Sequence, residues 1–234
     1  MIRLFLISLT ILFAMIMCNN PKDWNNNQNV KPPTIKTILS LGDSYTIGQS
    51  VSKAERWPNQ LAQALQDSGL NMEQPKIIAR TGWTTAELWN GIQNSQLDST
   101  YDLVTLLIGV NDQYRGLGIS YYCAGFLKLL NKAIQFSGND TDRVIVLSIP
   151  DYSVTPFAQA GDTARIRQEL DQFNALNQEL ALQAGVHYVD ITPISRKALK
   201  DRTYLAPDNL HPSGKMYGEW VGLVFPIADK ILSN

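Results

Sequence analysis

The sequence has few of the residues that build metal and redox sites. It contains two cysteines and two histidines among 234 residues. No cysteine-rich or histidine-rich spacing suggests a metal site, and no glycine-rich phosphate loop is present, so we expect neither a metal nor another cofactor. Twenty basic residues face 21 acidic ones, which gives a formal net charge of −1. The chain therefore lacks the basic surface that nucleic acid requires, and we expect no nucleic-acid partner.

Long hydrophobic runs are also scarce. The run from Leu4 to Met17 is shorter than the roughly 20 apolar residues that span a membrane. With Arg3 before it, the run is typical of a signal peptide over residues 1–17. Cys18 follows directly and resembles the acylated first residue of a bacterial lipoprotein, so lipidation of Cys18 is our hypothesis. Small residues are missing just before Cys18. An uncleaved N-terminal anchor and plain secretion therefore stay open as alternatives.

Residues 18–34 are rich in asparagine and proline and have almost no aliphatic side chains. Such a composition is typical of a tether rather than of a packed core. We therefore predict a folded domain over residues 35–234. The domain would be attached to a membrane through its N-terminus if Cys18 carries lipid. Whether the N-terminus is lipidated, kept as an uncleaved anchor or removed on secretion, we expect an exported protein. Its place would be the periplasm, the cell surface or the medium.

Apolar runs of strand length alternate with helix-length amphipathic stretches after the tether. Near-continuous apolar runs are typical of parallel strands that are buried on both faces. We predict an α/β fold, a three-layer α/β/α sandwich around a five-stranded parallel sheet with right-handed crossovers. The expected strands cover 37–41, 76–79, 102–108, 143–150 and 186–191, and the expected helices 57–65, 84–90, 121–136, 163–184 and 216–232. We interpret Cys123, in the third of these helices, as a buried core residue.

The first strand ends at Gly42, and Ser44 follows two residues later. Ligands bind at the carboxyl edge of open α/β sheets, so Ser44 is placed as a nucleophile would be. Gly-Asp-Ser is also an ordinary turn or helix-cap sequence, so the tripeptide alone is weak evidence.

A serine nucleophile needs a base, and the chain offers only His187 and His211. His187 lies in a strand-like alternation, which favours a half-buried structural histidine. Asp208 precedes His211 by three residues, in a loop that ends in proline and glycine. At that spacing the aspartate can accept a hydrogen bond from Nδ1–H and leave Nε2 free to take a proton. A loop aspartate can equally cap a helix.

Two further candidates follow the second and third predicted strands. The side-chain amide of Asn111 and the backbone N–H of Gly82 could both donate hydrogen bonds to a developing oxyanion. Asp43 and Asp112 could be taken as the carboxylate pair of a glycoside hydrolase, but a structural hydrogen-bonding role is the better interpretation of both.

Taken in order, these four blocks resemble the GDSL or SGNH hydrolase superfamily. Gly-Asp-Ser follows the first strand, a glycine the second and Gly-x-Asn-Asp the third, and Asp-x-x-His lies near the C-terminus. The blocks span Gly42 to His211. The stretches 109–116 and 149–156 also resemble bacterial GDSL-like lipases or acylhydrolases. One departure is Tyr45, which stands where the name-giving motif has leucine, and it leaves the subfamily open.

The resemblance implies a flavodoxin-like SGNH hydrolase fold and a serine hydrolase that acts on carboxylic esters through an acyl-enzyme intermediate. It implies Ser44 as the nucleophile, His211 as the base and Asp208 as the residue that orients the base. By the same implication, the oxyanion donors are the backbone N–H groups of Ser44 and Gly82 and the side chain of Asn111.

The substrate is less well defined by the sequence. Tyr114, Arg115 and Tyr152 follow predicted strands and are candidates for lining the substrate pocket. Aromatic side chains there suit a sugar face and an acyl chain equally well, so we expect a small-molecule ester, either a lipid or an acylated glycan. Two alternatives stay open: a carbohydrate O-acetylesterase, and a surface lipoprotein that binds glycan or lipid without catalysis.

Overall fold

The structure, a computed structural model, describes residues 34–233. The predicted signal peptide, Cys18 and the tether up to residue 33 lie outside the described residues. Five parallel strands form one sheet in the order β2-β1-β3-β4-β5. The strands are β1 (Ile38–Gly42), β2 (Lys76–Ala79), β3 (Leu103–Leu107), β4 (Val144–Leu147) and β5 (His187–Val189). This is the flavodoxin-like strand order, and it confirms the predicted α/β fold.

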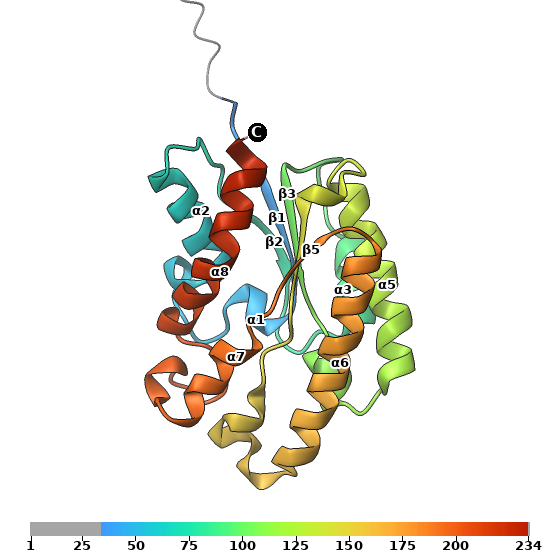
Figure 1. The fold of residues 1–234 in the computed structure, drawn as a ribbon, viewed down its shortest axis with the longest axis vertical. Helices are drawn as coiled ribbons and strands as arrows, with labels where there is room; N and C mark the ends of the chain where they lie inside the picture. The colour runs from blue at the N-terminus through green and yellow to red at the C-terminus, as the bar shows by residue number, and fades with distance from the viewer. Residues whose placement is uncertain (1–33, 234) are drawn as a thin grey trace, which may run out of the picture. The chain divides into compact units, whose positions relative to one another are not determined.

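Helices cover both faces of the sheet (Figure 1). On one face α2 (Trp57–Asp67) packs against α8 (Gly214–Ser233). The other face carries α3 (Thr85–Gln93), α5 (Ile119–Phe136) and α6 (Thr163–Gln183). The predicted three-layer sandwich is thus confirmed. None of the helices between residues 34 and 233 has the length and apolar character needed to cross a membrane.

The core sits between the sheet and these two helical layers. Every residue of β1, β3 and β4 is buried, as their continuous apolar runs predict. On α2 the predicted apolar stripe of Trp57, Leu61 and Leu65 is completely shielded from solvent. One expectation was wrong: Cys123 is only partly buried. It lies one position beyond Tyr122, and one residue along a helix turns its side chain away from the stripe that Tyr122 and Phe126 share.

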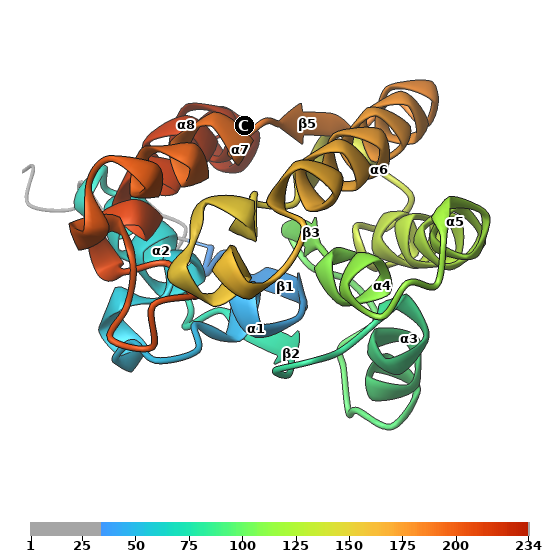
Figure 2. The same ribbon diagram turned by 90° about the horizontal axis from the view of Figure 1, so that it is seen from below.

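Three short helices follow strand ends and were not predicted: α1 (Ser44–Ile47), α4 (Val110–Tyr114) and α7 (Thr192–Ser195). Helices of four or five residues are too short to show an amphipathic period in the sequence. Two of them, α1 and α4, follow β1 and β3 at the carboxyl edge of the sheet, which Figure 2 views directly.

The backbones of β1 and β3 approach closely at that edge, at Gly42. A Cβ at this position would lie 2.5 Å from the carbonyl oxygen of Leu107 and 2.2 Å from Oγ1 of Thr46. Only glycine leaves room for both neighbours. This close approach fixes the start of α1, which carries Ser44.

Candidate functional site

A cavity of about 120 Å³ opens at the carboxyl edge of the sheet. It brings together four residues that come from four separate blocks of the sequence, namely Ser44, Gly82, Asn111 and His211. Its remaining lining residues are Tyr45, Thr81, Val110, Tyr114, Tyr152, Phe157 and Leu210. Of the three predicted pocket residues, Tyr114 and Tyr152 line this cavity, whereas Arg115 does not.

Ser44 lies at the turn from β1 into α1 and is only 4% exposed. The preceding residue, Asp43, caps α1, since its Oδ1 accepts a hydrogen bond from the N–H of Tyr45 at 3.0 Å. Among residues 34–233, Ser44 Oγ has no hydrogen-bond partner, and Ser44 lines the cavity. The hydroxyl is therefore available to the cavity.

His211 is held by the residue predicted to orient it. Its Nδ1 lies 2.7 Å from Oδ2 of Asp208, and its backbone N–H donates to Oδ1 of the same carboxylate at 2.9 Å. The ring also packs against Tyr45, with the ring centroids 5.6 Å apart, so the residue that departs from the family motif supports the imidazole. Because Nδ1 is bound to the carboxylate, Nε2 is the nitrogen that can accept a proton.

Asp208 receives a further hydrogen bond that the sequence did not reveal. Ser50, in the loop after α1, donates from its hydroxyl to Oδ2 of Asp208 at 2.5 Å. Partial burial raises the pKa of Asp208, but the hydrogen bonds from Ser50, His211 and Leu210 outweigh it and lower this pKa to about 2. The carboxylate is therefore ionised at neutral pH and can stabilise a positively charged imidazole.

Asp43 has the opposite electrostatic setting. Its side chain is fully buried, and its Oδ2 has no hydrogen-bond partner within the described residues. Burial raises the pKa of Asp43 to about 8; the N–H of Tyr45 opposes this rise, and the nearby carboxylate of Asp112 adds to it. Asp43 is thus mostly a neutral acid at pH 7, so it places no full negative charge next to Ser44.

This raised pKa makes stability depend on pH. The folded protein keeps a proton on Asp43 that the unfolded chain, with a pKa near 3.8, releases. The free energy of unfolding should therefore fall as pH rises from about 4 to about 8, by an amount on the order of a few kcal/mol. Asp43→Asn cannot ionise, so its urea midpoints should fall less over this range. Exposed Asp67 gives the matched control, Asp67→Asn, and a slope for Asp43→Asn equal to that of the control would contradict the prediction.

Asn111 and Gly82 both line the cavity. Asn111, in α4, donates one hydrogen of its Nδ2 to the carbonyl oxygen of Trp83 at 2.9 Å. An amide nitrogen carries two hydrogens, so the second remains free. Gly82 has a φ of 84°, in the left-handed region that glycine tolerates best.

The carboxylate of Asp112 accepts two hydrogen bonds from Thr85, one from the backbone N–H at 3.0 Å and one from the hydroxyl at 2.6 Å. This is the structural hydrogen-bonding role predicted for Asp112.

Three aromatic rings form one wall of the cavity. Tyr114 lies 6.2 Å from Tyr152 and 5.9 Å from Phe157 between ring centroids. The hydroxyl of Tyr152 donates to Oε1 of Gln113 at 2.9 Å, so the ring itself is what Tyr152 offers a ligand. Tyr114 and Phe157 are 58% and 49% exposed, so this wall continues from the cavity onto the surface.

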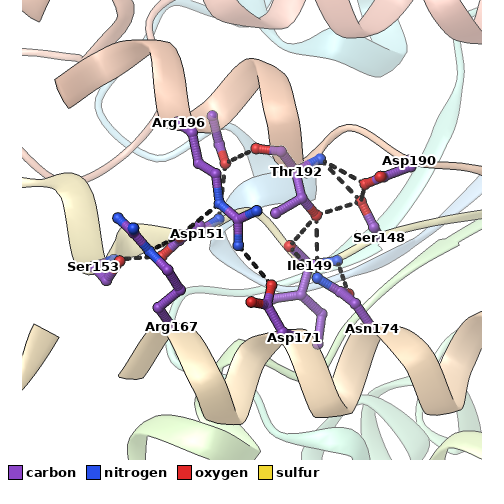
Figure 3. A network of polar contacts seen from close by, with 11 residues as sticks. Ser148, Ile149, Asp151, Ser153, Arg167, Asp171, Asn174, Asp190, Thr192 and Arg196 are labelled. Carbon is purple, nitrogen blue, oxygen red and sulfur yellow. Dashed lines mark hydrogen bonds and ion pairs between the residues drawn. The ribbon is translucent and has the colours of Figure 1, made fainter. Parts of the chain in front are cut away.

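A polar network fixes the loop that carries Tyr152 and Phe157 (Figure 3). The carboxylate of Asp151 is completely buried and pairs with the guanidinium groups of Arg196 at 2.9 Å and Arg167 at 3.3 Å. The side chain of Asn174 binds both the N–H and the carbonyl oxygen of Ile149, at 2.7 and 2.9 Å. The carboxylate of Asp151 thus has two arginine partners, and the backbone of Ile149 is bonded at both its N–H and its carbonyl oxygen. These contacts favour a rigid aromatic wall over an adaptable one.

The sequence did not indicate Ser50 or Leu210 as site residues. Each is an ordinary loop residue in the sequence, and only the tertiary fold brings it to the cavity or to Asp208. Phe157 ends the loop 151–157, which follows the fourth predicted strand and which the sequence indicates as a lining of the substrate pocket.

The other histidine lies in a different part of the fold. His187 is half-buried on β5, as predicted, and its Nε2 lies 4.0 Å from Asp142. It lines a larger cavity, of about 560 Å³, whose other lining residues include Lys36 ahead of β1 and Leu232 near the end of α8. This cavity lies at the opposite edge of the sheet and contains no serine. Between residues 34 and 233, no group of three or more histidine, cysteine and acidic side chains is placed to hold a metal ion.

Solved structures with the same fold include several esterases. TesA has a TM-score of 0.65 at 17% identity, with 84% of this chain and 100% of that chain covered. A variant of Axe2, an acetyl xylan esterase from Geobacillus stearothermophilus, has a TM-score of 0.65 at 18% identity, covering 82% and 94%. A lipolytic protein of the G-D-S-L family from Veillonella parvula has a TM-score of 0.62 at 17% identity, covering 82% and 97%. No curated protein matches the chain significantly.

The family described as GDSL-like Lipase/Acylhydrolase matches residues 40–218, which include every block from the Gly-Asp-Ser turn to the Asp-x-x-His loop. The chain therefore belongs to the GDSL-like lipase/acylhydrolase family, and the protein is a hydrolase that acts on ester bonds.

Proposed function

We propose that the protein is a serine esterase that hydrolyses carboxylic esters through a Ser44–His211–Asp208 triad and an acyl-enzyme intermediate. The observation that carries this proposal is the Asp208–His211 pair, joined at 2.7 Å, with the His211 ring in the wall of the cavity that Ser44 also lines. The arrangement supplies a nucleophile, a base and a carboxylate that orients the base.

In the first step, Ser44 Oγ attacks the ester carbonyl carbon while Nε2 of His211 takes the hydroxyl proton. The carbonyl oxygen becomes an oxyanion, which accepts hydrogen bonds from the N–H groups of Ser44 and Gly82 and from the side chain of Asn111. When the tetrahedral intermediate collapses, Nε2 gives its proton to the leaving alcohol. The acyl group remains on Ser44.

In the second step, a water molecule attacks the acyl-enzyme, and Nε2 of His211 takes one of its protons. A second tetrahedral intermediate forms in the same oxyanion site. Its collapse releases the carboxylic acid and returns the proton to Ser44 Oγ. Asp208, with its pKa of about 2, stays ionised through both steps and stabilises the imidazolium.

The size of the cavity favours a short acyl group, and a carbohydrate O-acetylesterase is therefore our second candidate. Pockets that hold drug-sized ligands measure roughly 300–1,000 Å³, so a cavity of about 120 Å³ suits a small group. A long acyl chain would have to run over Tyr114 and Phe157 at the surface. The same exposed rings suit the face of a sugar that carries the acetyl group.

A p-nitrophenyl ester series from acetate to palmitate, hydrolysed by residues 35–234, tests the proposal. We expect kcat/KM to be highest for short chains and to fall as the chain outgrows the cavity. A maximum at long chains would instead favour lipid or lysophospholipid substrates. Absence of hydrolysis for every ester, together with no labelling of Ser44 by a fluorophosphonate, would favour the non-catalytic binding protein.

We also propose that the protein is exported, with residues 1–17 as the signal peptide and Cys18 as the lipidated residue. The supporting observation is the sequence itself, in which a basic residue, a short apolar run and then a cysteine follow one another. Expression of the full chain with labelled fatty acid would test it. Incorporation that a Cys18→Ser variant loses supports lipidation, and secretion without incorporation contradicts it.

A further inference from the structure

Arg115 does not line the cavity, and its guanidinium binds the backbone of residues 80–84, between β2 and α3. We call this segment the oxyanion loop because it contains Gly82. Nη2 of Arg115 donates to the carbonyl oxygen of Gly82 at 2.5 Å. We propose that Arg115 is a positioning residue: by holding the carbonyl oxygen of Gly82 it restricts the backbone conformation of Gly82, so that the N–H of Gly82 faces the oxyanion. This inference rests on the proposed function, since it concerns the transition state of ester hydrolysis.

Gly82 needs such support because glycine has the widest backbone freedom of any residue. Its φ of 84° is one of several conformations open to it, and a different one would turn its N–H elsewhere. The loop is held on both sides of this residue. On one side the hydroxyl of Thr81 donates to Oε1 of Gln49 at 2.6 Å, and on the other Arg115 binds the Gly82 carbonyl oxygen.

Arg115 completes a set of bonds that join α4 to the oxyanion loop. Asn111 binds the carbonyl oxygen of Trp83, and Asp112 binds Thr85 at the start of α3. Arg115, at the C-terminal end of α4, adds the bond to Gly82. Consecutive parts of the loop are therefore attached to one short helix, which also presents the amide of Asn111. Two of the proposed oxyanion donors thus lie in one connected unit.

The second partner of Arg115 fixes the guanidinium itself. Nη2 lies 3.2 Å from Oε2 of Glu87, and the same carboxylate oxygen accepts the N–H of Thr84 at 2.8 Å at the start of α3. A guanidinium can bind a carboxylate and a carbonyl at once because its donors form a planar fork. Arg115 and Glu87 are 45% and 41% exposed, so the ion pair itself contributes little to folding stability.

The inference is tested with Arg115→Ala in the full-length domain, residues 35–234. Displacement of one oxyanion donor should lower kcat by about 10- to 100-fold, with KM within about twofold, because the donor acts mainly in the transition state. The rate of phosphonylation of Ser44 by a fluorophosphonate should fall in parallel, because that adduct also forms through an oxyanion. Arg115→Lys should recover part of both rates, since an ammonium can still donate to the Gly82 carbonyl oxygen.

Arg143 provides the matched control, because it forms an ion pair of similar exposure with Asp140, at 3.1 Å. Arg143→Ala should keep wild-type kinetics. Equal kcat in Arg115→Ala and Arg143→Ala, or a loss confined to KM, would overturn the positioning role. If the wild type hydrolyses esters through Ser44 under the same conditions, the proposed function survives that outcome. If the wild type shows no Ser44-dependent hydrolysis, the proposed function itself fails.

Discussion

Replacing Ser44 with alanine is expected to lower kcat for ester hydrolysis by about 10⁴- to 10⁶-fold, because no other group can form the acyl-enzyme. The fold should survive the change, since Ser44 Oγ has no hydrogen bond within residues 34–233 and its carbonyl oxygen still accepts the N–H of Gly48. Burst and steady-state kinetics with p-nitrophenyl acetate would measure the loss. Thermal unfolding would show that the variant is folded.

Ser153 is the matched control for this experiment. It is as deeply buried as Ser44, at 2% against 4% exposed, and it lies in the loop next to Tyr152 without lining the cavity. Ser153→Ala should keep wild-type kcat. Adding His211→Ala to Ser44→Ala should cost little more than either change alone, because residues of one triad act as a unit. Substantial turnover by Ser44→Ala would refute the acyl-enzyme mechanism.

Replacing Asn111 with alanine is expected to lower kcat by about 10²- to 10³-fold, the usual loss for one oxyanion donor. The free hydrogen of its Nδ2 would bind an oxygen whose charge develops only in the transition state, so KM should change much less. A kcat and KM comparison on a short ester would show the split. A loss seen only in KM would mean that Asn111 contacts the ground-state substrate instead.

Asn111 also anchors the oxyanion loop through Trp83, and the control must allow for that bond. Asn94, at the end of α3, donates from its Nδ2 to the carbonyl oxygen of Asn90 at the same 2.9 Å, but away from the cavity. Asn94→Ala therefore removes the same type of bond without a catalytic donor. It should change neither kcat nor KM, and an equal loss in both variants would contradict an oxyanion role for Asn111.

The sequence was sufficient to predict the parts of the fold that repeat a strong local pattern. Buried strands such as β1 and β3 are continuous apolar runs, and α2 shows a clear stripe, so both could be found without tertiary information. Three blocks of the predicted site follow strands β1, β2 and β3, and parallel strands bring their carboxyl ends to one edge. That rule placed Ser44, Gly82 and Asn111 together, whereas the resemblance to the family added the Asp208–His211 loop.

The sequence could not predict contacts that depend on exact side-chain direction. Arg115 follows Asn111 closely in the sequence, and we expected it in the substrate pocket, yet its guanidinium binds the carbonyl oxygen of Gly82. Ser50 and Asp208 are 158 residues apart, and neither the turn nor the loop shows a pattern that would pair them. Such contacts arise from tertiary packing, which no local period or motif encodes.

The strand β1 also separates the two ends of the described chain from the cavity. Thr34 lies ahead of the amino end of β1, and Ser44 follows the carboxyl end. The strand itself is about 16 Å long, at roughly 3.3 Å for each of its five residues. The C-terminal end of α8 returns to the same side as Thr34, where Lys36 and Leu232 line a common cavity. A solid support or a fusion partner joined at either end of the described chain would therefore leave the mouth of the cavity open. Even a large polymeric substrate could then reach the cavity.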